Sequence, residues 1–327
     1  MKKKITLVLA AIMAIACVLS VTGCGKKSSS DGKIGIIQMI ENGAFDDMRA
    51  GIIEELKANG FTDDDIDYQC AQGDATTLQT IAQNMATGNY KAVFTIATPA
   101  TQAVVNQESK TPVFFCSVSA PVAAGVISDM ENPDKNATGT SNAIPISDIF
   151  DFAGKLTPDA KKFGFIYCTS EDNSVNTITQ AKEFCEKNNI EYEEQTVTNS
   201  SEVQQAAQVL ADDVDAIFIP NDSVIQSAMT LVTEIARDKK IPVYGSSATM
   251  VDSGCFATIA ISDKEIGKIT ADMGLQYLND NKAVEDIPSI VVPADKTVIN
   301  EDTLNALGIT LSDDIKDSAT FVKDAFN

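Results

Sequence analysis

Three short segments of this chain occur twice, in the same order and at similar spacing. Each is an apolar run that ends in polar residues, and segments of helical periodicity separate them. The pairs are 33–38 with 162–167, 91–98 with 215–222, and 111–117 with 241–246. Apolar strands that alternate with helices predict an α/β fold, with parallel sheets covered on both faces by right-handed crossovers. Duplication of one α/β unit is the economical interpretation, although convergent patterning can also produce such similarity.

The N-terminus has the layout of an export signal. Lys2, Lys3 and Lys4 precede an apolar run that ends in small residues before Cys24. A cysteine at this point resembles the lipobox of bacterial lipoproteins, in which the thiol is acylated after cleavage. We therefore expect removal of residues 1–23, a lipid on Cys24 and a flexible polar tether over 24–32. An uncleaved membrane anchor is the alternative, for which the apolar run is at the short limit.

Composition argues against several classes of function. The 327 residues carry a formal charge of −21, so no binding to nucleic acid by charge is expected. The absence of histidine excludes Ser-His-Asp and Cys-His catalysis and histidine-based zinc sites. No P-loop or dinucleotide-binding glycine motif is present, so we expect no cofactor and no enzyme. Five further cysteines lack paired short spacing, which argues against a disulfide framework and a metal site but leaves one disulfide open: Cys70, Cys116, Cys168, Cys185 and Cys255.

The segment 93–102 has the pattern of a buried strand that runs directly into a helix. Pro99 falls in the first helical turn, where a missing N–H is tolerated. Free amides at the start of this helix, together with the Thr98 hydroxyl, suit an anion such as a carboxylate. An ordinary strand-to-helix turn is the alternative. If each copy of the repeated α/β unit forms one lobe and the two lobes face each other, the strand ends of both lobes border one cleft. The candidate ligand-binding residues at these ends are Gln38, Asn42, Phe45, Asp46, Thr98, Pro99, Ala100, Thr101, Ser117, Val118, Ser119, Ser170, Asn173, Ser174, Asn221, Asp222, Ser246 and Ser247.

Several blocks carry a family resemblance, namely residues 71–74 (AQGD), 96–102 (IATPATQ), 170–174 (SEDNS), 197–207 (VTNSSEVQQAA) and 298–300 (VIN). On these blocks the chain resembles the substrate-binding lipoproteins of ABC importers, in the family whose members handle tryptophan or tyrosine. The resemblance implies a type I periplasmic-binding-protein fold, with two Rossmann-like lobes joined by three crossovers at a hinge. We expect residues 33–143 and about 264–283 in one lobe, and 144–263 and about 284–327 in the other. The loop 42–46 (NGAFD) departs from the His-Pro-x-Leu-Asp pattern of the family, so aromatic specificity does not follow from that loop.

An amino-acid ligand would distribute its charges between the lobes. Its carboxylate would lie at the helix after Thr98, with Ser117 and the amides of Ala100 or Thr101 as further donors. Its ammonium needs an acid, for which Asp222 is the first candidate and Asp46 the second. Ser170, Asn173 and Ser174 would close over the ligand, and Phe45 would stack on its side chain. The alternative roles are helix capping for Asp222 and for the 170–174 cluster, and core packing for Phe45.

The sequence therefore predicts a monomeric receptor, held on the outer face of the membrane by a lipid on Cys24. It would deliver an amino acid, with an aromatic one favoured, to an ABC permease and its ATPase. A signalling module of the same fold, a sugar or purine ligand, and a hydrolase on a flavodoxin-like scaffold are the alternatives. The last segment, Leu311–Asn327, is predicted to be helical.

Overall fold

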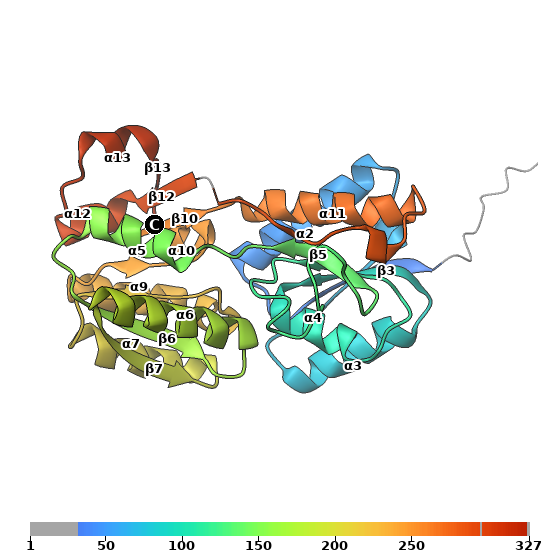
Figure 1. The fold of residues 1–327 in the computed structure, drawn as a ribbon, viewed down its shortest axis with the longest axis horizontal. Helices are drawn as coiled ribbons and strands as arrows, with labels where there is room; N and C mark the ends of the chain where they lie inside the picture. Colours follow the sequence, from blue (N-terminus) through green and yellow to red (C-terminus); the bar gives the residue numbers. More distant parts are fainter. Residues whose placement is uncertain (1–31, 295, 326–327) are drawn as a thin grey trace, which may run out of the picture. The chain divides into compact units, whose positions relative to one another are not determined.

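The computed structural model describes residues 32–294 and 296–325, so Cys24 and the predicted signal sequence lie outside the described residues. From Lys33 onwards the strands form two sheets (Figure 1). We call the part around the first sheet lobe 1 (residues 33–142 and 263–292) and the part around the second sheet lobe 2 (residues 143–262 and 296–325).

Lobe 1 has six strands: β1 (Lys33–Gln38), β2 (Ile66–Cys70), β3 (Tyr90–Ile96), β4 (Val113–Cys116), β5 (Ala137–Ser141) and β11 (Ile290–Val291). Their order in the sheet is β11-β5-β4-β3-β1-β2, and all pairs are parallel. One face is covered by α2 (Gly43–Ala58) and α11 (Asp263–Leu278), and the other by α3 (Ala75–Thr87) and α4 (Ala97–Val105) (Figure 1).

Lobe 2 has seven strands: β6 (Lys162–Cys168), β7 (Glu191–Val197), β8 (Ala216–Phe218), β9 (Val243–Tyr244), β10 (Ala257–Ala260), β12 (Lys296–Asn300) and β13 (Thr320–Val322). Their order is β13-β12-β10-β9-β8-β6-β7. Its helices are α5 (Ile146–Leu156), α6 (Asp172–Asn188), α7 (Val203–Ala211), α8 (Ser223–Gln226), α9 (Met229–Asp238), α10 (Ala248–Asp252), α12 (Glu301–Leu307) and α13 (Asp313–Ser318). Short 3-10 turns lie in lobe 1 at Asp63–Asp65 and Val284–Asp286, and in lobe 2 at Ser200–Glu202.

The predicted α/β fold with two similar lobes is confirmed, because the repeated segments form β1 and β6, β3 and β8, and β4 and β9. Two details differ from the expectation. The pairing of β10 with β12 is antiparallel, so the second sheet is not wholly parallel. Residues 284–292, which we had placed in the second lobe, stay with the first, because β11 pairs with β5.

Successive residues of a central strand face opposite cores. In β3, Phe94 belongs to the cluster under α2 and α11, whereas Val93 belongs to the cluster under α3 and α4. Side chains alternate between the two faces of a strand, so a strand covered on both faces has to be apolar throughout. This is why uninterrupted apolar runs predicted the sheets.

Two glycines let α2 and α11 cross at backbone contact. A Cβ on Gly51 would lie 2.1 Å from the carbonyl oxygen of Lys264, and a Cβ on Gly267 would lie 2.1 Å from that of Met48. No larger residue fits at either position without moving a helix. The crossing places the first turn of α11, which begins with Asp263, against the middle of α2.

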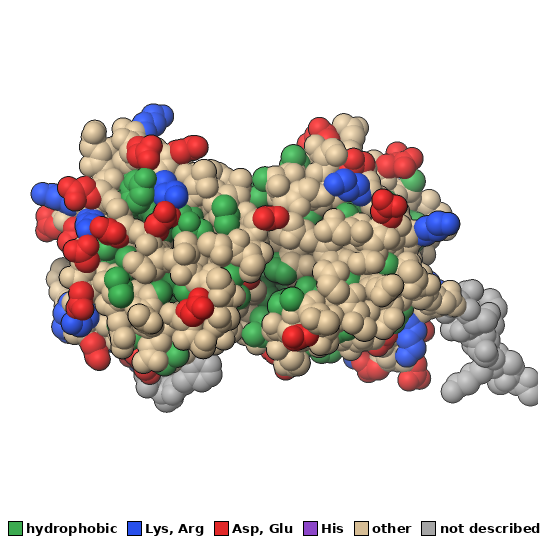
Figure 2. All heavy atoms as spheres, turned by 90° about the horizontal axis from the view of Figure 1, so that it is seen from below, with side chains coloured by type: hydrophobic (Ala, Val, Ile, Leu, Met, Phe, Trp, Pro, Cys, Tyr) green, Lys and Arg blue, Asp and Glu red, His purple; other side chains and the backbone are tan. Residues whose placement is uncertain are grey.

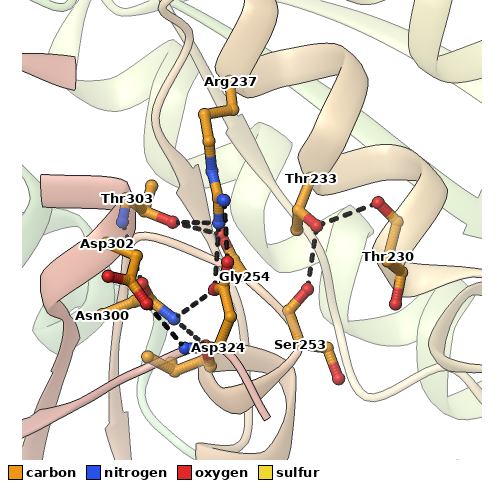
Figure 3. A network of polar contacts seen from close by, with 10 residues as sticks. Thr230, Thr233, Arg237, Ser253, Gly254, Asn300, Asp302, Thr303 and Asp324 are labelled. Carbon is orange, nitrogen blue, oxygen red and sulfur yellow. Dashed lines mark hydrogen bonds and ion pairs between the residues drawn. The ribbon is translucent and has the colours of Figure 1, made fainter. Parts of the chain in front are cut away.

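The C-terminal segment is anchored to lobe 2 by a polar network (Figure 3). Arg237 on α9 forms an ion pair of 2.8 Å with Asp324, and Asn300 Nδ2 donates to Asp324 at 2.9 Å. Arg237 also donates to the Thr303 hydroxyl at 2.6 Å. The prediction of one helix over Leu311–Asn327 is wrong for its second half, since β13 adds to the edge of the sheet beside β12 after α13 ends.

The surface agrees with the acidic composition. On the face shown in Figure 2, acidic side chains outnumber basic ones and the two kinds are interspersed. Within residues 32–294 and 296–325, no helix combines the length and the apolar character needed to cross a membrane. In the same part of the chain the five cysteines from Cys70 to Cys255 are all free thiols, which answers the question of a disulfide among them.

Candidate functional site

A cavity lies where the carboxyl ends of the strands of both lobes meet. Seven predicted residues line it: Phe45, Thr98, Ser117, Ser119, Asn173, Asn221 and Ser247. We call it the central cavity. Its volume is about 20 Å³, which is room for little more than one water molecule. A larger ligand can therefore enter only when the lobes move apart.

The lobe 1 wall of the cavity is the junction between β3 and α4. No side chain caps α4, whose N-cap is Ile96, so the first-turn amides lack a partner from the capping residue. Ala97 adopts a φ of 67° there, and Ser117 at the end of β4 adopts 63°. Non-glycine residues in this left-handed region are uncommon and concentrate at functional sites.

Thr98 is a buried polar residue in this wall whose hydroxyl is unpaired. Its side chain is 1 % exposed, and its hydroxyl has no hydrogen-bond partner. A buried polar group without a partner costs free energy, so such an atom in a cavity wall indicates a place for a ligand atom.

Glu171 is the acidic side chain of the lobe 2 wall. It precedes α6 and is buried, and its carboxylate accepts hydrogen bonds from the Ser223 amide (3.1 Å and 3.2 Å) and the Ser223 hydroxyl. Burial raises the pKa of Glu171, and the neighbouring Asp222 carboxylate raises it further. A cation bound in the cavity would relieve both effects.

Asp222 itself faces away from the central cavity. Its side chain is 0 % exposed, and its oxygens accept from the amides of Cys168 (2.7 Å), Val224 (3.0 Å) and Ile225 (3.0 Å). Burial raises its pKa, and these backbone donors oppose the rise. The geometry is that of the N-cap of α8, the alternative role considered for this residue.

Asp263 is a second buried carboxyl in the cavity wall, at the start of α11. It accepts from the Thr249 hydroxyl at 3.3 Å across the two lobes. Burial raises the pKa of Asp263 to about 7, and the charges of Asp47 and Asp252 add to the rise. The glycine crossing of α2 and α11 fixes its position.

Asn173 combines an anchored and a free end. It is 4 % exposed, and its Nδ2 donates to the Asn221 carbonyl at 2.6 Å, whereas its Oδ1 has no partner. The unpaired hydroxyl of Thr98 and the unpaired Oδ1 of Asn173 therefore belong to opposite walls of one cavity. One is able to donate and the other only to accept.

A wider opening adjoins the central cavity and shares Ala44 and Gln226 with it. We call this opening, with a volume of about 270 Å³, the acidic mouth. Two predicted residues, Asn42 and Asp46, line it, and so do Asp47 and Asp252 from opposite lobes.

Other predicted residues lie elsewhere. Gln38 is buried in a network in which Arg49 donates to both Gln38 and Asp46. Ser246 lines a separate pocket with Asn221, and Ser170 is exposed. Neither the central cavity nor the acidic mouth is lined by Gln38, Pro99, Ala100, Thr101, Val118, Ser170, Ser174, Asp222 or Ser246.

Sequence reasoning missed several polar residues of the central cavity, namely Asn142, Glu171, Ser223, Gln226 and Asp263. Glu171 stands inside the block 170–174, whose serines and asparagine we chose instead. Asp263 had a signal only in its position at the start of a helix, after a strand end. Its place in the cavity depends on the crossing of α2 and α11.

The chemistry of the cavity follows from its lining. Lobe 1 presents the α4 amides, hydroxyl groups and the Asp263 carboxyl group, and lobe 2 presents the Glu171 carboxyl group and the Asn173 carbonyl. Among the described residues that line it there is no Lys or Arg. In residues 32–294 and 296–325 no group of three ligating side chains is arranged to hold a metal ion. The arrangement suits a small molecule with one ammonium group, which the acids would bind, and one anionic group, which backbone amides and hydroxyls would bind without a basic side chain.

The chain matches known proteins over most of its length. The family model for the ABC transporter substrate binding protein matches residues 33–323. The tyrosine-binding protein of Clostridioides difficile (strain R20291) is 34% identical over 322 residues, which cover 94% of this chain and 92% of that protein.

Two solved structures extend the comparison. An ABC domain from Streptococcus pneumonia in complex with L-Trp has a TM-score of 0.85 at 30% identity, covering 90% of this chain and 100% of that chain. The ligand-free, open structure of a substrate binding protein with adhesive properties from Clostridium difficile has a TM-score of 0.68 at 34% identity, covering 90% and 99%. More distant solute-binding proteins share the type I periplasmic-binding-protein fold alone.

Proposed function

This chain belongs to the family of ABC transporter substrate-binding proteins, and we propose that it binds an aromatic amino acid in the central cavity. The observation that carries the proposal is the pair of unpaired buried atoms, Thr98 Oγ1 and Asn173 Oδ1, on opposite walls. Relatives named for tyrosine or solved with L-Trp support the ligand class. The departure of the loop 42–46 from the expected pattern leaves tyrosine and tryptophan as equal candidates.

The ligand would lie with its ammonium towards the buried acids and its carboxylate towards α4. Glu171 and Asp263 replace Asp222 as the proposed partners of the ammonium, because both line the cavity. The carboxylate would accept from Thr98 and the free first-turn amides of α4. Phe45 and Met48, which line the cavity from α2, would pack against the aromatic ring.

Binding would require opening and closing of the lobes. The present cavity is too small for an amino acid, and the structure superposes better on the L-Trp complex than on the open protein, although the latter is the more similar in sequence. This difference supports a closed arrangement here. The three connections between the lobes, near residues 143, 262 and 294, would then act as the hinge.

The cellular setting completes the proposal. Members of this family are extracytoplasmic and serve an ABC transporter, and the lipid on Cys24 would keep this one at the membrane surface. A monomer would present its ligand to a permease driven by an ATPase. No catalytic step is part of this role.

Calorimetric titration of the purified protein tests the ligand. L-Tyr and L-Trp should bind, and each should raise the thermal midpoint because they bind only the folded state. Deaminated analogues, which keep the ring and the carboxylate, should bind at least about tenfold more weakly, since they leave the buried acids unpaired. If neither amino acid binds while a sugar or a purine does, the ligand assignment is wrong.

A further inference from the structure

Gln102 is part of the block 96–102 but has no place in the central cavity. It lies on α4 one turn after Thr98, on the side of the helix that faces lobe 2. Its Nε2 donates to the Asp172 carboxylate in lobe 2 at 2.7 Å. The Thr249 hydroxyl also donates a hydrogen bond across the lobes, to Asp263. That bond is longer, at 3.3 Å, and lies beside the connection between the lobes near residue 262.

The side chain of Gln102 is already oriented by its own lobe. The same Nε2 donates to the Ala124 carbonyl at 2.9 Å, within lobe 1. A side chain held in this way loses little conformational freedom when it bonds to the opposite lobe. The second bond therefore adds to closure with a small entropic cost.

The position of Asp172 links its hydrogen bond with Gln102 to the central cavity. It is the first residue of α6 and lies between Glu171 and Asn173, both of which line the central cavity. Fixing Asp172 against α4 thus fixes the two lobe 2 side chains that would face the ligand. An acid in the first turn is also favoured by the helix dipole, so α6 holds this carboxylate in place.

We propose that Gln102 and Asp172 form a latch that closes the lobes over the ligand and sets the rate of ligand release. The proposal rests on ligand binding in the central cavity. The latch forms only when the lobes meet, both over a bound ligand and in the ligand-free closed arrangement described here. It slows dissociation, because it has to break before the ligand can leave.

Stopped-flow kinetics with L-Tyr and L-Trp, on the wild type and on variants, measures the latch. Gln102→Ala should raise the dissociation rate about fivefold, the effect of one partly exposed hydrogen bond to a charged group. Gln102→Glu should raise it further, because two carboxylates would then face each other. Adding Asp172→Asn to Gln102→Glu should restore slow release, since an amide again donates to a carboxylate.

Gln107→Ala is the matched control. Gln107 donates to Gln79 at 3.3 Å, within lobe 1, so its loss should leave the dissociation rate unchanged. Equal dissociation rates for wild type, Gln102→Ala and Gln102→Glu would overturn the latch while leaving ligand binding intact.

A second measurement does not depend on the ligand. Small-angle X-ray scattering of the ligand-free protein should show a larger radius of gyration for Gln102→Glu than for wild type, and the added Asp172→Asn should reverse the increase. If no amino acid binds, the proposed function fails, and the scattering still decides the latch: identical radii for all variants would contradict it.

Discussion

The two lobes treat the same strand-to-helix junction in opposite ways. In lobe 2, Asp222 caps α8 at the end of β8 and is saturated with three backbone donors. In lobe 1, the matching position after β3 holds Thr98, α4 has no side-chain cap, and the hydroxyl is unpaired. The matching junctions thus differ: the polar residue is saturated with hydrogen bonds in lobe 2 and has an unpaired hydroxyl in a cavity wall in lobe 1.

The difference shows why a polar residue at a strand end is weak evidence for a ligand contact. A carboxylate satisfied by three amides has little capacity left for a ligand, whereas an unpaired hydroxyl in a buried wall gains from one. The acid that lobe 2 offers to the cavity comes from its first strand end instead, through Glu171.

The largest expected effect is on stability. Asp222→Ala removes the acceptor of three buried amides and should lower the free energy of unfolding by about 2–3 kcal/mol, measured by urea denaturation. The comparison between the lobes breaks if Asp222→Ala leaves stability unchanged and abolishes amino-acid binding.

The next effect is a pH dependence of opposite sign for folding and for binding. The pKa of Asp263 is raised from 3.8 to about 7, and that of Glu171 is raised as well, so their protonated forms stabilise the ligand-free fold. This stabilisation is complete below the unfolded pKa values and is lost as the pH rises through a pKa of about 7 for Asp263 and about 8 for Glu171. An ammonium requires the ionised carboxylates, so affinity should instead increase over the same range.

Thermal midpoints and titrations between about pH 5 and about pH 8 measure the two trends. Affinity should change by up to about tenfold per pH unit for each proton released on binding. Asp263→Asn should flatten both curves. An affinity that falls as the pH rises from 6 to about 8 would mean that these acids do not face the ammonium.

The smallest effect separates the two junctions most sharply. Thr98→Val removes an unpaired hydroxyl at constant shape, so stability should be unchanged or slightly higher while affinity falls about three- to tenfold. Thr101→Val is the control, because the Thr101 hydroxyl is hydrogen-bonded to the Ala97 carbonyl at 2.8 Å. That variant should lose about 1 kcal/mol of stability. Equal losses of stability in the two variants would show that Thr98 is an ordinary structural residue.

Local rules predicted much of the fold. Apolar runs gave strands β1, β3 and β6, and the capping role considered for Asp222 is the one it has at the start of α8. The short strand β13 escaped prediction because it carries no apolar run of its own and is held by pairing with β12 and by the Asp324 network.

The candidate site was predicted in outline only. Seven of its residues follow from the rule that ligands bind beyond parallel strand ends, and Thr98 is among them. That rule gives the end of the sheet but not the direction of a side chain. Gln38 and Asp222 sit at such ends and point into hydrogen-bond networks, whereas Glu171 and Asp263 reach the cavity.

The sequence by itself determined the alternation of strands and helices, the repeated segments and the family, because these depend on periodicity and on neighbouring residues. Only the tertiary structure decided which acids face the cavity, since that depends on contacts between distant segments. The approach of α11 to α2 at Gly51 and Gly267, and the use of Asp222 by the Cys168 amide 54 residues away, are such contacts. Burial and hydrogen-bond saturation are properties of the packed chain, and they separate a cap from a ligand contact where residue type cannot.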